Sequence, residues 1–154
     1  MQGTAIYHAP VGELVITYQD GAVIALKRAD ATALPEDAPN ALTEVVCRQL
    51  DEYFAGTRTT FDFPLRLQGT AFQEKVWAAL RDIPYGETRS YQQIAQAIGQ
   101  PKACRAVGMA NHRNPIYIVV PCHRVVGANG ALTGYGGGLD MKKALLALEK
   151  AHRR

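Results

Sequence analysis

Apolar and β-branched residues are concentrated in two runs near the start of the chain and predict β-strands. Residues 3–28 contain these two β-rich runs, 12–18 and 22–27. Asp20-Gly21 lies between the two runs, and this pair is a strong signal for a tight hairpin turn. The pattern therefore predicts an antiparallel hairpin near the N-terminus.

The hydrophobic period then changes to that of a helix. Apolar residues recur at helical spacing over residues 41–55, with Asn40 suited to cap the start and Gly56 to end the helix. Residues 59–67 are predicted to form a further strand, followed by a linker near Gln68-Gly69. We find no catalytic constellation in this half, and we expect it to have a supporting role.

The second half is predicted to be mainly helical, with short helices separated by turns. Thr70-Ala71-Phe72-Gln73 and Ser90-Tyr91-Gln92-Gln93 are both capping boxes, and each predicts the start of a helix. Gly99 ends the second of these helices, and Pro101 suits the first turn of a third over residues 102–112. Two short helices joined by a tight turn are the helix-turn-helix pattern, although a tightly packed internal helix pair gives the same pattern.

The C-terminal segment combines a glycine-rich loop with a final helix. Tyr135 lies within the glycines of residues 134–138, which favours a loop that forms the wall of a ligand site over a flexible connector. Asp140 is predicted to cap the last helix, and Glu149 lies near the end of that helix.

Residues 118–126 carry the candidate chemistry. Ile118-Val119-Val120 is predicted to be a short buried strand that ends at Pro121, because proline has no backbone N–H to donate. Cys122 follows at once, with His123 beside it. A cysteine whose proton a neighbouring imidazole can take is a strong nucleophile, although a free cysteine is more often an inert buried residue.

Charge is distributed unevenly between the two halves. Residues 1–68 hold five Lys or Arg against nine Asp or Glu, whereas residues 69–154 hold twelve against five. An acidic part joined to a basic part is expected when only one part binds a polyanion, although ordinary solvated surface charge is the alternative. We therefore divide the chain into a support domain, 1–68, and a basic second domain, 69–154, which is the part expected to bind a polyanion.

The cysteines and histidines argue against a metal centre. The three cysteines are widely spaced and the four histidines are scattered, so the sequence contains no paired zinc ligands. An odd number of cysteines indicates a reduced, cytoplasmic protein, and no run is apolar enough for a secretion signal or a membrane span. A cysteine protease is conceivable, but none of its local motifs is present.

The motifs of the second half resemble those of one family. Pro121-Cys122-His123-Arg124-Val125 is the hallmark of the O6-alkylguanine–DNA alkyltransferases, and the similarity runs from Thr70 to about Glu149. The motifs that match in the same order are Ser90-Tyr91-Gln92-Gln93, residues 101–108, Asn114-Pro115 and Tyr135-Gly136-Gly137-Gly138. The resemblance implies an α/β fold, with a small ribonuclease-H-like N-terminal domain and a mainly helical, winged-helix-like C-terminal domain that contains the helix-turn-helix.

The resemblance also implies a suicide reaction without a cofactor. Cys122 would take the alkyl group from guanine O6, with thymine O4 as a second candidate, in an irreversible transfer. His123 would act as base through a water and be held by Glu149, and Asn114 would brace the turn that carries the cysteine. Tyr91 would help to flip the nucleotide out and donate a proton to the base. The target carbon is hidden in the duplex, so flipping is required.

DNA would be bound in the minor groove without sequence specificity. The resemblance places Arg105 in the gap left by the flipped nucleotide, with Lys102 and Ala103 on the same helix-turn-helix and Tyr91 at its first helix. Val125, Tyr135, Gly136 and Tyr117 would line the base pocket. The expected state is a monomer, and cooperative binding along DNA is left open.

Two positions depart from the pattern of some relatives. Gly136 stands where some members have a serine whose hydroxyl reaches the guanine oxygen, and Tyr117 stands where some have a proline. Two other functions fit these residues less well. A damage-binding protein of the alkyltransferase-like type would lack Cys122, and a sequence-reading regulator would need more base-reading side chains than residues 102–112 offer.

Overall fold

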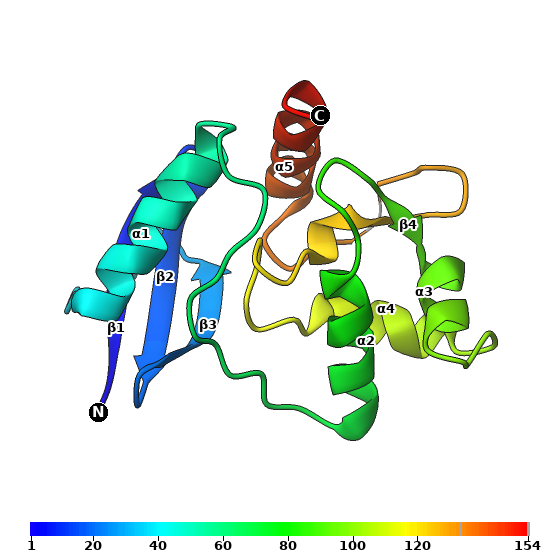
Figure 1. Cartoon of the computed structure of the whole chain (residues 1–154), viewed down its shortest axis with the longest axis horizontal. Coiled ribbons are helices and arrows are strands. Elements are labelled where there is room, and N and C mark those ends of the chain that lie inside the picture. The colour runs from blue at the N-terminus through cyan, green and yellow to red at the C-terminus, as the bar shows by residue number, and fades with distance from the viewer. Residues whose placement is uncertain (133, 154) are drawn as a thin grey trace. The chain divides into compact units, whose positions relative to one another are not determined.

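The structure, a computed structural model, describes residues 1–132 and 134–153. The chain divides into two compact units, Met1–Leu67 and Gln68–Arg154, which we describe in turn. Figure 1 shows strands and one helix in the first unit, and most of the helices in the second.

The first unit is a three-stranded antiparallel sheet with one helix. Strands β1 (Gln2–Ala9), β2 (Gly12–Gln19) and β3 (Ala22–Arg28) pair in sequence order. The predicted hairpin is confirmed: Asp20 and Gly21 have φ angles of 49° and 82°, the left-handed region that a tight two-residue turn requires.

Helix α1 (Ala41–Phe54) forms where a helix is predicted, and it packs against β1 of this sheet. Asn40 caps it, because its side chain accepts a hydrogen bond from the Thr43 amide. The Tyr7 ring of β1 stacks on Phe54 with centroids 6.2 Å apart, and its hydroxyl donates to Asp51 over 2.7 Å. These contacts join the helix to the edge of the sheet.

The strand predicted over residues 59–67 is wrong. This segment makes only a single parallel bridge, between Leu65 and Val23. The Val23 amide donates to Pro64 O and the Arg66 amide donates to Val23 O. Pro64 has no amide hydrogen of its own, and no longer ladder forms along this segment.

The second unit contains four helices, a short 3₁₀ turn and two short strands among the described residues. In chain order these elements are α2 (Ala71–Arg81), β4 (Arg89–Ser90), α3 (Tyr91–Ala97), α4 (Cys104–His112), η1 (Cys122–Arg124), β5 (Val125–Val126) and α5 (Leu139–Ala151). Strands β4 and β5 pair in parallel. The predicted α/β class and the helix-turn-helix formed by α3 and α4 are confirmed.

Both capping boxes predicted in this unit are present. Thr70 caps α2 and Ser90 caps α3, each reciprocally with the glutamine three residues later. The buried indole of Trp77 on α2 donates to the Ala110 carbonyl of α4 over 2.9 Å. This bond holds the helix-turn-helix against α2.

Three boundaries in this unit differ from the predictions. Ile118-Val119-Val120 is buried but forms consecutive turns and no strand. Helix α4 begins at Cys104, so Lys102 lies in the turn before it. Gly138, with a φ of 99°, precedes α5, and Asp140 lies in the first turn of the helix without capping it.

Candidate active site

The segment before Cys122 is a compact turn held by one asparagine. Asn114 is fully buried; its Nδ2 donates to Val120 O over 2.7 Å, and its Oδ1 accepts from the Ile116 amide over 3.0 Å. Ile118 has a φ of 71°, which a β-branched residue adopts only when its surroundings impose it. Asn114 thus closes the turn that ends at Cys122.

Cys122 opens the 3₁₀ turn η1 and is almost completely buried, with 2 % of its surface exposed. Burial raises the pKa of its thiol to about 11, although hydrogen bonds from Asn114 and Tyr135 and the charge of Lys142 lower it. At neutral pH the thiol is therefore protonated, and a nucleophilic reaction requires a base that takes this proton.

His123 and Glu149 form the buried pair that can supply this base. His123 Nε2 lies 2.6 Å from Glu149 Oε2, and both side chains are fully or almost fully buried. Burial lowers the pKa of His123, while the Glu149 carboxylate acts in the opposite direction. The other ring nitrogen, Nδ1, is buried and has no hydrogen-bond partner among the residues that the structure describes. A neutral imidazole with one nitrogen held by a carboxylate and the other open is suited to accept a proton.

Arg124 completes a charged cluster around Glu149. Its Nε donates to Oε1 over 2.8 Å and its Nη2 to Oε2 over 3.1 Å, while Nη1 donates to the Ile83 carbonyl. Burial by itself would raise the pKa of Glu149, but His123 and Arg124 outweigh it and hold that pKa well below its usual range. The Gly86 amide also donates to Glu149 Oε1 over 3.2 Å. Glu149 is therefore a carboxylate at neutral pH.

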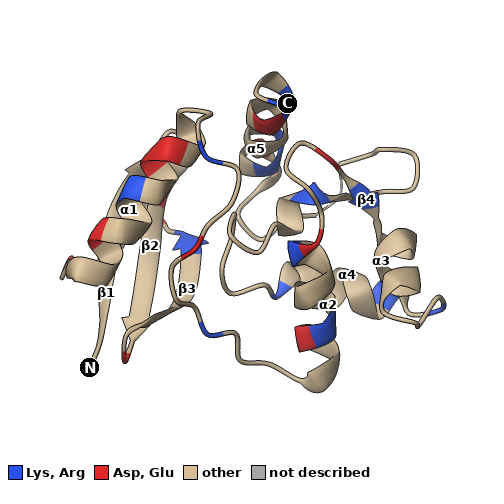
Figure 2. Ribbon diagram, viewed as in Figure 1, with Lys and Arg blue, Asp and Glu red and all other residues tan. Residues whose placement is uncertain are grey.

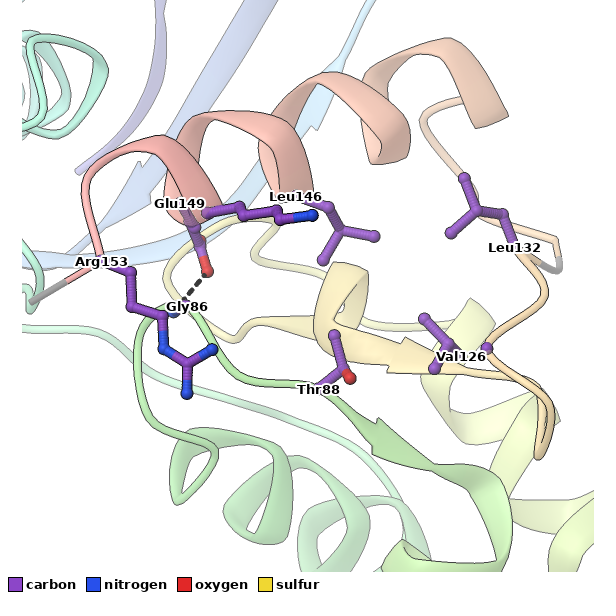
Figure 3. Close-up of a pocket in the computed structure, with 9 residues that line it drawn as sticks. Gly86, Thr88, Val126, Leu132, Leu146, Glu149 and Arg153 are labelled. Carbon is purple, nitrogen blue, oxygen red and sulfur yellow. Dashed lines mark hydrogen bonds between the residues drawn. The ribbon is translucent and has the colours of Figure 1, made fainter.

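Figure 3 shows Glu149 at the edge of a surface pocket of the second unit. Its carboxylate points toward Gly86, and Arg153 lies on the same side of the pocket. Leu146 and Leu132 supply apolar walls. Cys122 does not line this pocket, so the buried thiol and the pocket are separate features of the unit.

Two tyrosines and the glycine-rich loop lie together near the thiol. The rings of Tyr117 and Tyr135 have centroids 5.3 Å apart, and both residues are buried. Gly137 packs so closely that a Cβ there would approach the Tyr135 ring within 2.9 Å. The carbonyl of Val125, another predicted pocket residue, accepts a hydrogen bond from Lys142 Nζ over 2.6 Å.

The predicted DNA-binding residues lie on the helix-turn-helix. Tyr91 is the first residue of α3, and its ring faces Gly108 of α4, where a Cβ would lie 3.8 Å from it. Arg105 on α4 and Lys102 before it are exposed, and Ala103 is half-buried at the start of the helix. Figure 2 shows basic residues along this turn and helix.

The two other cysteines of the chain are not fully buried. Cys47 on α1 and Cys104 at the start of α4 are each partly exposed. Cys104 Sγ donates to Gln92 Oε1 over 2.9 Å, so it contributes to the contact between α3 and α4. Cys122 is the buried cysteine of the chain.

Three residues of the site were not predicted from the sequence. Arg124 holds Glu149, the fully buried Lys142 supplies a cation near the thiol, and the buried Asn111 directs its Nδ2 toward Cys122 O at 3.4 Å. Lys142 could have been found: it precedes Glu149 by seven residues on α5, and so lies on the same helix face.

Neither a metal site nor a membrane span is found in the described part of the chain. Within residues 1–132 and 134–153, no three His, Cys, Asp or Glu side chains gather closely enough to hold a metal ion. No helix over the same residues has the length and apolarity needed to cross a bilayer.

Comparisons with known proteins agree over nearly the whole chain. Residues 71–151 match the DNA-binding domain of 6-O-methylguanine DNA methyltransferase, and residues 4–67 match its ribonuclease-like domain. A methylated-DNA–protein-cysteine methyltransferase of Mycolicibacterium paratuberculosis is 54 % identical over 149 residues, which cover 94 % of this chain and 90 % of the relative.

Solved structures give the same result. The crystal structure of the Mycobacterium tuberculosis O6-methylguanine methyltransferase superposes with a TM-score of 0.91 at 48 % identity, covering 100 % of this chain and 96 % of that one. A crystal structure described as Mycobacterium tuberculosis OGT in complex with DNA has a TM-score of 0.88 at 49 % identity, covering 97 % and 93 %.

Proposed function

The chain belongs to the 6-O-methylguanine DNA methyltransferase family, and we propose that Cys122 is the cysteine that receives the alkyl group. The protein repairs DNA by transferring an alkyl group from a damaged base to one of its own cysteines, and it binds DNA to do so. The observation that carries the assignment to Cys122 is its place: a buried thiol directly beside a histidine that a buried carboxylate holds.

The chemistry follows from this arrangement. His123 accepts the thiol proton through a water at Nδ1, while Glu149 holds the ring through Nε2 and stabilises its positive charge. The Cys122 sulfur then forms a bond to the alkyl carbon, the bond from carbon to guanine O6 breaks, and the electron pair stays with the base. The product thioether has no good leaving group, so the thiol is consumed and each molecule reacts once.

The helix-turn-helix supports the DNA-binding part of the proposal. The target carbon is inaccessible in a stacked base pair, so the nucleotide is flipped out, with Tyr91 at the start of α3 assisting and donating a proton to the base. Arg105 on α4 occupies the gap, while Lys102 contacts phosphate next to Ala103. We propose that α4 binds in the minor groove, as the family resemblance implies, and that the protein acts as a monomer. The small residues of α4 offer few side chains that read bases, which favours binding without sequence specificity.

Location is part of the same proposal. Each of the three cysteines is free, and the reaction consumes a reduced thiol. Both facts favour the cytoplasm, where thiols stay reduced.

The test is the mass of the peptide that contains Cys122. After incubation with duplex DNA that carries O6-methylguanine, this peptide is expected to gain one methyl group, and no other peptide should change. Cys122→Ser should abolish the gain, while the matched variant Cys47→Ser should react at the wild-type rate. Methylation of a different residue, or full repair by Cys122→Ser, would refute the assignment.

A further inference from the structure

The space beside Gly136 is occupied by the side chain of Tyr117. A Cβ built on Gly136 would overlap the Tyr117 hydroxyl and would lie 3.2 Å from the ring carbon that carries it. The ring itself is buried against Tyr135 and is 6 % exposed, so it has little freedom to move away. The position of the Tyr117 hydroxyl therefore requires a glycine at 136, because any side chain there would occupy the same space.

The hydrogen bonds of the described residues include none from this hydroxyl, and it is not one of the fully buried polar atoms that lack a partner. A phenol donor without a protein acceptor is open to water or to a bound ligand. The charge of a Cys122 thiolate acts on Tyr117, and the ring that stacks on Tyr117 belongs to Tyr135, which hydrogen-bonds Cys122. An open donor thus belongs to a side chain that packs on Tyr135, the tyrosine that hydrogen-bonds the reactive sulfur.

The reaction places an acceptor close to that wall. In an in-line displacement the leaving oxygen lies one bond beyond the alkyl carbon, which itself approaches the sulfur to about 3 to 3.5 Å before it reacts. As the bond from carbon to oxygen breaks, negative charge develops on this oxygen. A fixed hydrogen-bond donor at that point stabilises the transition state more than the ground state.

We propose that the Tyr117 hydroxyl donates a hydrogen bond to the guanine O6 as it leaves the alkyl carbon, and that Gly136 keeps the space for this hydroxyl. The inference rests on the proposed function of Cys122. Tyr117 does not transfer its proton: the thiol proton goes to His123, the electron pair of the broken bond goes to O6, and the phenol remains a donor. Burial and the nearby thiolate both raise the pKa of Tyr117, so it stays protonated throughout.

The first experiment removes the hydroxyl and keeps the ring. Tyr117→Phe is expected to lower the single-turnover rate constant of methyl transfer from O6-methylguanine in duplex DNA by about tenfold, with unchanged affinity for the DNA. Tyr18→Phe, in the first unit, is the matched control and should react at the wild-type rate. An unchanged rate constant in Tyr117→Phe would overturn the proposal.

The second experiment changes the leaving atom instead of the protein. Sulfur is a weak hydrogen-bond acceptor, so with DNA that carries S6-methyl-6-thioguanine the difference between wild type and Tyr117→Phe should shrink to less than about twofold. A purely structural loss would slow both substrates equally, and that result would also overturn the proposal.

The third experiment tests the dependence between the two residues. Gly136→Ala should slow the wild type about as much as Tyr117→Phe does, because the new methyl displaces the hydroxyl. In a Tyr117→Phe background the same change should add little, since the hydroxyl is already gone. Independent, multiplicative losses would contradict the coupling. If the wild-type protein carried no methyl group on Cys122 after the reaction, that result would instead refute the proposed function itself.

Discussion

At the scale of single residues, the reactivity of Cys122 depends on groups that oppose one another. Burial raises the pKa of the thiol to about 11, which keeps it protonated at rest. A thiolate of high pKa is also intrinsically more nucleophilic than one of low pKa. In the proposed mechanism the resting thiolate population is small but strongly nucleophilic, and His123 removes the thiol proton when substrate is bound.

Glu149→Gln should be strongly destabilising, because Arg124 then stays buried without its counter-ion. Arg124 is 6 % exposed and makes two hydrogen bonds to the carboxylate. Breaking one side of a buried ion pair costs about 3 kcal/mol or more in the free energy of unfolding. Trp77 is the single tryptophan of the chain and is buried in the second unit. Its fluorescence during a urea titration measures the free energy of unfolding of the variant and of the wild type.

Glu87→Gln is the matched control for this measurement. Glu87 pairs with Arg89 over 3.1 Å, but both side chains are partly exposed. Exposed pairs contribute at most about 1 kcal/mol, so this variant should remain near the wild-type stability. Equal losses in the two variants would show that Arg124 does not depend on Glu149.

At the scale of secondary structure, local signals predicted where most elements begin. Asn40, Thr70 and Ser90 each cap a helix through bonds that involve only residues three positions apart. Such contacts depend only on residues that are neighbours in the chain, so they can be predicted from the sequence alone. The same holds for the Asp20-Gly21 hairpin.

The turn before Cys122 could not be predicted in this way. Ile118-Val119-Val120 has the composition of a strand, and its conformation is imposed by two hydrogen bonds of the Asn114 side chain. The charged cluster of the site is likewise made by contacts between residues about 25 positions apart, on η1 and α5. The sequence showed which residues are chemically able to act, and the fold decides which of them meet.

Arg105→Ala tests the role of α4. Filling the gap in the base stack offsets part of the few kcal/mol that flipping costs, so the variant should slow repair in duplex DNA by about tenfold. Reaction with the free base O6-methylguanine, which needs no flipping, should be unaffected. Single-turnover rate constants at saturating duplex separate this effect from weaker binding.

Arg113→Ala is the control for charge alone. Arg113 follows α4 directly and is exposed. Its loss should weaken binding to duplex DNA, but it should leave the rate constant at saturation unchanged. If Arg105→Ala slowed the free base and the duplex by the same factor, its place in the base stack would be wrong.

At the scale of the whole chain, the two compact units differ in charge and in the functional elements that they contain. Nine of the fourteen acidic residues lie in Met1–Leu67, whereas twelve of the seventeen basic residues, the helix-turn-helix and the buried thiol lie in Gln68–Arg154. The buried charges also lie in the second unit, on η1 and α5. Its stability should therefore respond to pH more strongly than its composition suggests.

Acid should destabilise the second unit, and His123 should dominate between pH 7.5 and 5.5. Burial holds its folded pKa below the unfolded value of about 6.5, so below that pH the unfolded state binds a proton that the folded state does not. The free energy of unfolding then falls with pH, by at most about 1.4 kcal/mol per pH unit for one proton. Glu149, whose pKa is lowered in the fold, adds a further loss only below about pH 4.3. Urea titrations followed by Trp77 fluorescence should show this slope in the control His112→Gln and lose it in His123→Asn. A slope that survives in His123→Asn would place the titrating group elsewhere.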